Sequence, residues 1–290
     1  MPASGVEINR TSIDLPREVS REIIQKAQED SAVMALARRI TLPGKGLTIP
    51  EILTDPEPAW VTETNKKPVS KPTFGTKNIK GYTMAVIVPF SNQFRRDYDA
   101  LYDACVSRLP RVLAQKFDNT VFGGTAVPGS DFDTLASAGA VALTAENAYA
   151  QLVTVDTNIA IAGGLLNGYV ISPQAKGVLL SAVDGNERPL FINSVSEGAI
   201  PMILGQPTKL SRGVFVTGTP PTIGFAGDWT HAVYGVVEDI SLSISDQASI
   251  TVENEIVNLW ERNMFAVRVE FEVGFRADVT KFQRLTGSST

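Results

Sequence analysis

The segment between Trp60 and Lys80 constrains the fold of this chain most strongly. After Glu63 it holds five lysines and no acid, and an apolar run rich in β-branched residues follows it over 82–88. If residues 60–73 pair with residues 76–88, each arm of the ribbon spans roughly 40 Å at about 3.3 Å per residue. Because an isolated two-stranded ribbon is at best marginally stable in water, this one is expected to lie on a neighbouring subunit. The pattern predicts an assembly protein. The five lysines, which are candidate inter-subunit contacts, are Lys66, Lys67, Lys71, Lys77 and Lys80.

A long amphipathic helix is predicted directly after the ribbon. Ser91 is a candidate N-cap, and apolar residues recur at three- and four-residue steps over 94–121, which gives one apolar stripe. Gly123 and Gly124 are expected to end the helix. Pro110 is expected to kink or divide it, because proline lacks a backbone donor and clashes with the preceding turn. An ordinary core helix of a mixed domain is the alternative interpretation.

Charge is unevenly distributed along the chain. Residues 1–125 hold 17 Lys and Arg against 14 Asp and Glu, a net charge of +3, whereas residues 126–290 hold 9 against 17, a net charge of −8. A dedicated nucleic-acid-binding protein would present a strongly basic face, so that class is not favoured. The distribution favours a subunit whose basic loop meets an acidic surface of its neighbour, a contact that fixes register more than it adds affinity. A solvated lysine loop is the alternative.

Membrane-spanning and secreted classes are not indicated by the sequence. No run approaches eighteen apolar residues, and the first residues lack the apolar core of a signal peptide. The single cysteine, Cys105, lies on the apolar stripe of the predicted helix, so we expect a buried thiol and no internal disulfide. Folding in a reducing cytoplasm is therefore expected.

The sequence contains no recognisable catalytic motif. His231 is the only histidine, which excludes a histidine metal cluster, and no Gly-x-Ser-x-Gly elbow or phosphate-binding loop is present. Carboxylate pairs such as Glu238/Asp239 and Glu253/Glu255 could perform acid–base chemistry, as in glycosidases, but solvated faces explain them better. We expect no enzyme activity, no catalytic, cofactor-binding or metal-binding residues, and no cofactor. A carboxylate hydrolase that is active as a monomer is the alternative.

The rest of the chain mixes helices and strands, which predicts the α+β class. Over 265–275, six apolar residues alternate strictly with residues that are mostly charged, so we expect a long strand with one buried face. A buried strand is predicted over 169–171, and a self-contained subdomain over about 140–235. Shorter helices are expected at 17–28, 31–37, 145–160 and 173–182.

Several short motifs follow one another along the chain at characteristic spacings. They are Ala59-Trp-Val-Thr-Glu63, Phe117-Asp-Asn-Thr-Val-Phe-Gly-Gly124, Gly168-Tyr-Val-Ile-Ser-Pro173, Asp184-Gly-Asn-Glu-Arg-Pro189, Gly227-Asp-Trp229 and Trp260-Glu-Arg-Asn-Met-Phe-Ala-Val-Arg-Val-Glu270. Each motif alone is weak evidence, but their order and spacing over about residues 15–285 are specific. In this respect the chain resembles the major capsid proteins of tailed bacteriophages of the Hong Kong 97 type.

The resemblance implies a Hong Kong 97-like capsid fold and a structural function. The chain would be a major capsid protein that self-assembles, as pentamers and hexamers, into an icosahedral phage head. The head would enclose double-stranded DNA without reading its sequence. The implied parts are an N-terminal arm at 1–45, an extended loop at 46–88, a peripheral domain with a long spine helix at 89–136 and 238–290, and an axial domain at 137–237.

The resemblance also implies partners and a location. The partners are other copies of the chain, together with scaffolding, portal or decoration proteins, and no membrane. The location is the virion, after assembly in the bacterial host cytoplasm. Because arm-like sequence begins shortly after Met1, we expect a version without a fused scaffolding segment. An encapsulin-type bacterial nanocompartment shell protein of the same fold, which encloses cargo enzymes, is the alternative.

Overall fold

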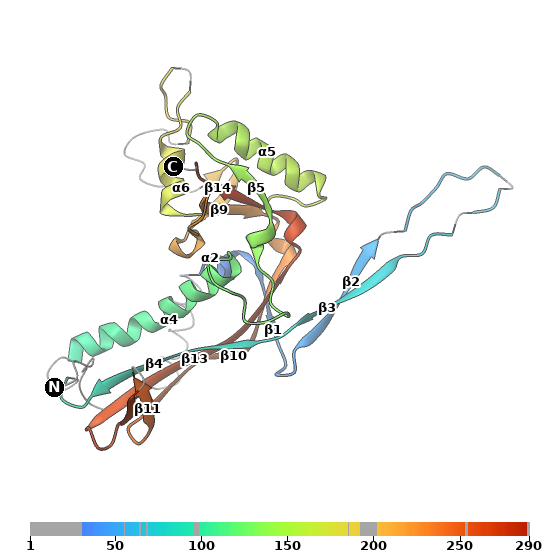
Figure 1. Ribbon diagram of the computed structural model, residues 1–290. Coiled ribbons are helices and arrows are strands. Elements are labelled where there is room, and N and C mark those ends of the chain that lie inside the picture. The colour runs from blue at the N-terminus through green and yellow to red at the C-terminus, as the bar shows by residue number, and fades with distance from the viewer. Residues whose placement is uncertain are drawn as a thin grey trace.

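The computed structural model describes residues 31–54, 56–63, 65–67, 69–94, 99–184, 186–191, 202–252 and 255–288. The helix predicted at 17–28 lies outside the described residues. Figure 1 shows an elongated body with one sheet at each end and a long ribbon that projects from it. The predicted α+β class is confirmed. Within the described part of the chain, no helix is long and apolar enough to cross a membrane.

One half of the body is built on a four-stranded sheet. Its strands are β1 (Arg38–Thr41), β4 (Tyr82–Ser91), β10 (Ala232–Ser245) and β13 (Met264–Ala277), in the order β1-β10-β13-β4. Strand β10 runs parallel to β1 and antiparallel to β13, which is also antiparallel to β4. The alternation predicted in β13 is confirmed, because its apolar residues are buried on one face. These residues are Phe265, Val267, Val269, Phe271, Val273 and Phe275.

The helix α4 (Asp99–Val121) packs on the apolar face of this sheet (Figure 1). The ring of Phe117 meets the ring of Phe275 edge to face, with centroids 6.3 Å apart. Pro110 lies inside α4 and does not divide it into two elements. The predicted N-cap at Ser91 is wrong, because the ladder with β13 continues to that residue and holds its backbone extended.

Gly123 and Gly124 end α4, as predicted. The amide of Gly124 donates to the carbonyl of Asn119 (2.8 Å) and the amide of Gly123 to that of Thr120 (3.2 Å), which is the Schellman pattern of helix ends. Gly123 has a φ of 83°, and a Cβ there would lie 2.4 Å from the Cβ of Ala136. Both the left-handed backbone and the close packing therefore require glycine.

The other half of the body is a six-stranded sheet covered on one face by two helices. These helices are α5 (Ala148–Ile161) and α6 (Pro173–Leu180). Helix α5 begins three residues later than predicted, and α6 begins at its proline, with Ser172 as its N-cap. The opposite face of this sheet joins the core under α4. The strands are β5 (Gly139–Ala142), β6 (Gly168–Ile171), β7 (Met202–Ile203), β8 (Gln206–Leu210), β9 (Thr222–Gly227) and β14 (Phe282–Thr286), in the order β5-β14-β9-β6-β8-β7.

Two strand-to-strand crossings join the sheets. Strand β9 continues through the turn η3 (Trp229–His231) into β10, and β13 continues through η4 (Val279–Lys281) into β14. Asp228 and Asp278 cap these turns in the same way, since each carboxylate accepts hydrogen bonds from the amide and the hydroxyl of the threonine two residues on. The two turns are also hydrogen-bonded to each other through their backbones. The two crossings therefore form a narrow connection between the sheets that these hydrogen bonds hold together.

The predicted division of the chain into domains stays a prediction. Two segments lie in a different sheet from most of their predicted domain. Strand β14, within the predicted peripheral domain, belongs to the six-stranded sheet, and residues 232–237, within the predicted axial domain, belong to the four-stranded sheet. The physical reason is that the chain passes from one sheet to the other through the short turns η3 and η4 between consecutive strands, where no linker composition marks a boundary.

Shorter elements complete the body. The helix α2 (Ala32–Leu36) is capped by Ser31, as predicted. The turn η1 (Leu135–Ser137) precedes β5, and the turn η2 (Arg212–Val214) follows β8. A small hairpin of β11 (Ser249–Val252) and β12 (Glu255–Asn258) extends beyond β10 and β13.

The ribbon consists of β2 (Leu47–Thr54) and β3 (Thr73–Ile79) (Figure 1). The described residues between them, 56–63, 65–67 and 69–72, are called its distal loop. A ribbon is therefore present, but the predicted pairing of 60–73 with 76–88 is wrong. Strand β3 pairs with β2, and the following strand β4 pairs with β13 in the body. Burial of the apolar face of β4 under α4 stabilises it more than pairing with a polar, proline-broken segment would.

Candidate functional site

The candidate catalytic groups that the sequence offers are spread over separate parts of the structure. No group of three His, Cys, Asp or Glu side chains among them could hold a metal ion. His231 is exposed, and its Nε2 lies 3.8 Å from the carboxylate of Asp228, which serves as the cap of η3. Glu238 and Glu255 lie in different sheets, and Glu253 is outside the described residues. The candidate site is therefore a surface, and the ribbon is its most unusual part.

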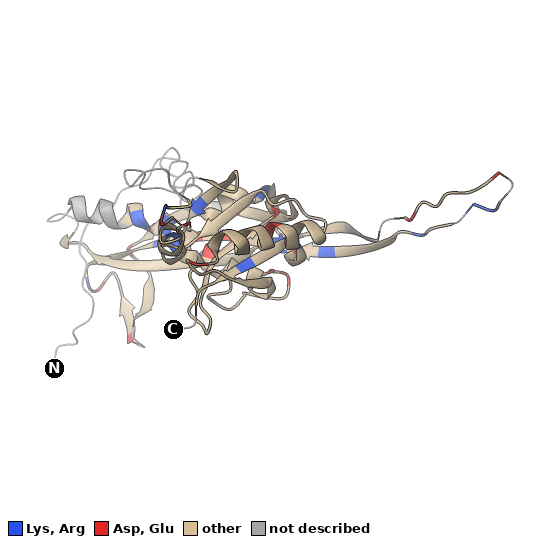
Figure 2. Cartoon of the chain, turned by 90° about the horizontal axis from the view of Figure 1, so that it is seen from above, with Lys and Arg blue, Asp and Glu red and all other residues tan. Residues whose placement is uncertain are grey.

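The five candidate lysines lie along the ribbon, whose loop reaches far from the body (Figure 2). Lys77 is half-buried on β3, and its Nζ donates a hydrogen bond of 3.3 Å to the carbonyl oxygen of Ala277 in β13. It therefore supports the fold of its own chain. The other four are exposed, namely Lys80 at the base of the ribbon and Lys66, Lys67 and Lys71 in the loop.

The ribbon and its loop also expose large apolar side chains. Trp60 is as exposed as an isolated residue, and Val69 and Phe74 are 82% and 69% exposed. Large apolar side chains that a projecting segment leaves in water are candidates for burial against a partner. The sequence argument from lysines did not single out these residues. A tryptophan between prolines and lysines, where no core element is expected, was the available signal.

Arg276 fixes the ribbon to the body, and we call its contacts the ribbon junction. Its Nε donates to the carbonyl of Asn78 in β3 (2.6 Å), while its terminal nitrogens donate to the carboxylates of Asp133 (2.6 Å) and Asp131 (3.1 Å). The Asp133 carboxylate also accepts from the amide of Ala277 (3.2 Å). Because the Arg276 side chain is only 13% exposed, these charge-assisted bonds are less screened than surface ion pairs. The junction therefore sets the angle at which the ribbon leaves the body.

Gly274 lies next to the ribbon junction, and replacing it is expected to strain the backbone at the base of the ribbon. A Cβ on Gly274 would lie 2.2 Å from the carbonyl oxygen of Lys80, a backbone atom at the base of the ribbon. Gly274→Ala should lower the free energy of unfolding by about 2 kcal/mol, as overpacking does. Gly177→Ala is the matched control, because no atom lies within 4 Å of its Cβ and α6 should gain about 0.5–1 kcal/mol. Urea unfolding of both variants measures this, and equal stabilities would contradict the close approach.

A buried carboxylate joins the N-terminal segment to α4. Asp118 is fully buried and accepts hydrogen bonds from the hydroxyl of Ser31 (2.6 Å), the amide of Ala32 (2.9 Å) and the hydroxyl of Ser211 (3.2 Å). Ser31 caps α2 and Ser211 caps η2, so a single side chain ties α2, α4 and η2 together. The sequence predicted the capping role of Ser31 but not its partner.

The Asp118 contacts predict a pH dependence of stability. Burial raises the pKa of Asp118 to about 6, although hydrogen bonds from Ser31, Ala32, Val33 and Ser211 act to lower it. Because the folded-state pKa lies above the unfolded value, the contribution is complete below about pH 4 and is lost as the pH rises through about 6. We expect the wild-type minus Asp118→Asn difference in unfolding free energy to fall by about 2 kcal/mol between pH 4 and pH 7. A difference that stays constant over this range would contradict the effect.

Comparisons with known proteins agree with one another. The phage capsid family matches residues 13–281 of this chain. The probable major capsid protein gp17 of Mycobacterium phage D29 is 30% identical, over 94% of this chain and 89% of its own length. A solved structure from Gordonia phage Cozz has a TM-score of 0.76 at 21% identity and covers 90% of this chain and 87% of its own. One from Mycobacterium phage Adephagia has a TM-score of 0.76 at 20% identity, with coverages of 96% and 99%.

Proposed function

Because this chain belongs to the phage capsid family, we propose that it is the major capsid protein of a tailed phage and assembles into a closed icosahedral head. The resemblance to capsid proteins of the Hong Kong 97 type, and the fold that it implies, are confirmed. Curated relatives named as major capsid proteins favour a phage head over an encapsulin-type compartment.

The observation that carries the proposal is the ribbon with its exposed loop. The distal loop extends away from both sheets (Figure 1). Its described residues include exposed apolar and basic side chains, among them Trp60, Lys66 and Val69. Contact with another copy of the chain would bury these exposed side chains. Many weak contacts of this kind, repeated by symmetry, stabilise a shell once it closes.

The partners under this proposal are first of all further copies, in pentamers and hexamers. The axial domain (137–237) would surround the symmetry axes, and the peripheral domain (89–136 and 238–290) would join neighbouring groups. Scaffolding, portal or decoration proteins would be further partners, and double-stranded DNA would be enclosed without sequence-specific contacts. Assembly would take place in the host cytoplasm and the product would be the virion. This role is mechanical and requires no catalytic step.

Electron microscopy and sedimentation of the purified chain test the proposal. We expect closed, hollow shells that sediment far faster than the 31.2 kDa subunit. Heads from infected cells should contain nuclease-protected DNA, whereas an encapsulin-type shell would contain protein cargo. A chain that stays monomeric both alone and when expressed with its neighbouring genes would contradict the proposal.

A further inference from the structure

The side of the subunit formed by α4, β8 and η2 exposes only positive charges among its described side chains. The one acidic side chain described on these elements is Asp118, which is buried. Residues 198–227, which include β8 and η2, contain no acid at all, although they belong to the acidic half of the chain. We call the exposed cations of this side the α4–η2 basic face, and they are Arg108, Arg111, Lys116, Lys209 and Arg212.

The fold brings the arginines of this face together from two segments. The side-chain amide of Asn119 in α4 donates to the carbonyl of Gly213 in η2 (3.4 Å), which places Arg212 beside the helix. Arg108 and Arg111 precede Asn119 by eleven and eight residues, close to three and two helical turns. Both therefore lie on the side of α4 against which η2 packs.

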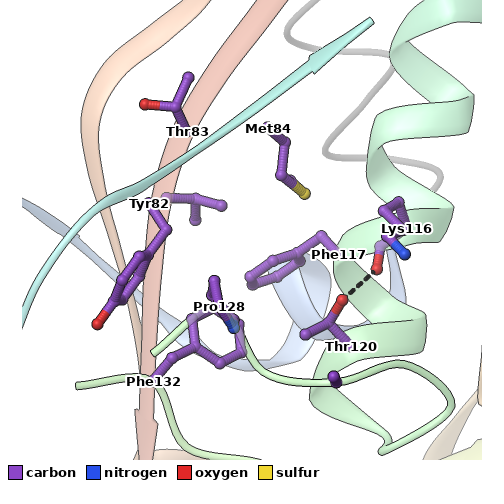
Figure 3. A pocket seen from close by; sticks show the side chains of 10 residues that line it. Tyr82, Thr83, Met84, Lys116, Phe117, Thr120, Pro128 and Phe132 are labelled. Atoms are coloured by element: carbon purple, nitrogen blue, oxygen red, sulfur yellow. Dashed lines mark hydrogen bonds between the residues drawn. The ribbon is translucent and has the colours of Figure 1, made fainter. Parts of the chain in front are cut away.

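The two lysines point to the same side of the body. Lys209 pairs in the parallel ladder with Val170, which is buried in the core under α4. Because directly paired residues of neighbouring strands share a face, Lys209 projects on the α4 side of the six-stranded sheet. Lys116 is exposed at the rim of the apolar pocket between α4 and β4, toward which Phe117 points (Figure 3).

The opposite face of the four-stranded sheet is predominantly acidic. The apolar side chains of β13 are buried under α4, so Glu270 and Glu272, which alternate with them, point away from α4. Glu272 pairs in the ladder with Glu238 of β10, and Arg268 forms an ion pair with Glu270 (3.3 Å). The body therefore has a basic side and a mainly acidic side, and a polyanion would be attracted to the first and repelled by the second.

We propose that the α4–η2 basic face contacts the phosphate backbone of the double-stranded DNA that the shell encloses. This inference rests on the proposed shell function and assigns the DNA contact to named residues. DNA carries one negative charge per about 1.7 Å of its axis, and contacts from Arg and Lys to phosphates carry no base-sequence information. The planar guanidinium groups of the three arginines suit phosphate oxygens, which they bind through two parallel hydrogen bonds.

Repetition in the shell favours DNA over a short acidic segment of another protein. Each subunit would present the same few cations to one continuous polyanion, so individually weak contacts add up over the whole shell. A single subunit needs only a modest affinity for this, which agrees with a chain whose net charge is −5.

Photocrosslinking in DNA-filled heads tests the contact. A photoreactive amino acid replaces Val112, which is 52% exposed on α4 next to Arg111. The matched control replaces Ile87, which is 50% exposed on the face of the four-stranded sheet opposite α4. Irradiation should attach DNA to the position-112 protein several-fold more than to the control. Adducts with protein only at position 112, or equal DNA adducts at both positions, would overturn the contact, while filled heads from both variants would leave the shell function intact.

A second measurement uses the unassembled subunit and does not depend on shells. Three cations of the basic face are neutralised together, as Arg108→Gln, Lys209→Gln and Arg212→Gln. The matched control removes three exposed cations elsewhere, as Lys45→Gln, Arg188→Gln and Arg262→Gln. Fluorescence anisotropy of a short DNA duplex measures binding over a series of salt concentrations.

The salt dependence identifies the phosphate contacts. Each lost contact lowers the slope of log K against log salt by about 0.9, so the neutralised variant should bind more weakly, with a slope shallower by about 2–3. The control should keep a slope close to that of the wild type. Equal slopes for the neutralised variant and the control, or no DNA binding by the wild-type subunit at low salt, would show that the proposal is wrong.

Discussion

Replacing Lys66, Lys67 and Lys71 together by glutamate is expected to leave the subunit folded and to prevent shells from closing at ordinary concentrations. These three lysines are exposed in the distal loop, and no hydrogen bond or ion pair joins them to the body among the described residues of their own chain. Reversing them places carboxylates against an acidic neighbour, since residues 126–290 carry a net charge of −8. Reversal of three surface contacts amounts to about 1–3 kcal/mol per subunit.

The effect on assembly should be much larger than the effect on one contact. Because each factor of ten in an equilibrium constant corresponds to about 1.4 kcal/mol, the concentration needed for assembly should rise about tenfold or more. Light scattering during assembly, over a series of subunit concentrations, measures this shift. Added salt screens exposed charges, so the difference between variant and wild type should shrink as ionic strength rises.

Lys209, Arg212 and Arg262 provide the matched control for the loop lysines. All three are exposed on the body, and their replacement by glutamate changes the net charge of the chain by the same amount. We expect this variant to assemble close to normally. If it fails as completely as the loop variant, net charge rather than the loop controls closure. Normal particles from the loop variant would equally contradict a register-setting role.

Asp118→Ala is expected to have the largest effect on the stability of the subunit. The change leaves the hydroxyls of Ser31 and Ser211 and the amide of Ala32 without their acceptor in a fully buried position. Unsatisfied buried donors cost about 1–3 kcal/mol each, and relief of a buried charge offsets part of this, so we expect a net loss of about 3 kcal/mol. That is a large share of the 5–15 kcal/mol typical of folded domains, as an order of magnitude.

The loss of stability should appear first in α2, which Asp118 joins to α4. Amide hydrogen exchange in α2 should accelerate more than exchange in β13, because α2 has few other ties to α4. Asp156→Ala, at an exposed position of α5, is the matched control and should change stability by less than about 0.5 kcal/mol. Equal stabilities of the two alanine variants would show that the Asp118 contacts do not hold the N-terminal segment.

The sequence predicted best the elements whose pattern is set by burial on one face. The strict alternation in β13 predicted a long strand, since a shift of its pairing register by one residue would expose every apolar side chain. Local turn chemistry was equally reliable, because Gly123, Ser31 and Pro173 each satisfy a helix end within a few residues. The resemblance to phage capsid proteins added the order of these elements and their function.

The sequence failed where tertiary contacts decide between local alternatives. The apolar run at β4 could have paired with the ribbon, but burial under α4 and pairing with β13 assign it to the body. For the same reason Ser91 extends a strand instead of capping a helix. Arg276 and Asp118 were missed because their partners lie far away along the chain, at Asp133 and Ser31, and no local pattern marks such contacts.

A cryo-electron microscopy reconstruction of the assembled particle tests the central claim most directly. We expect a closed icosahedral shell in which every ribbon lies across an adjacent subunit, with density for the distal loop against that subunit. Chains that form only open aggregates, or closed shells whose ribbons fold back on their own subunits, would contradict the account.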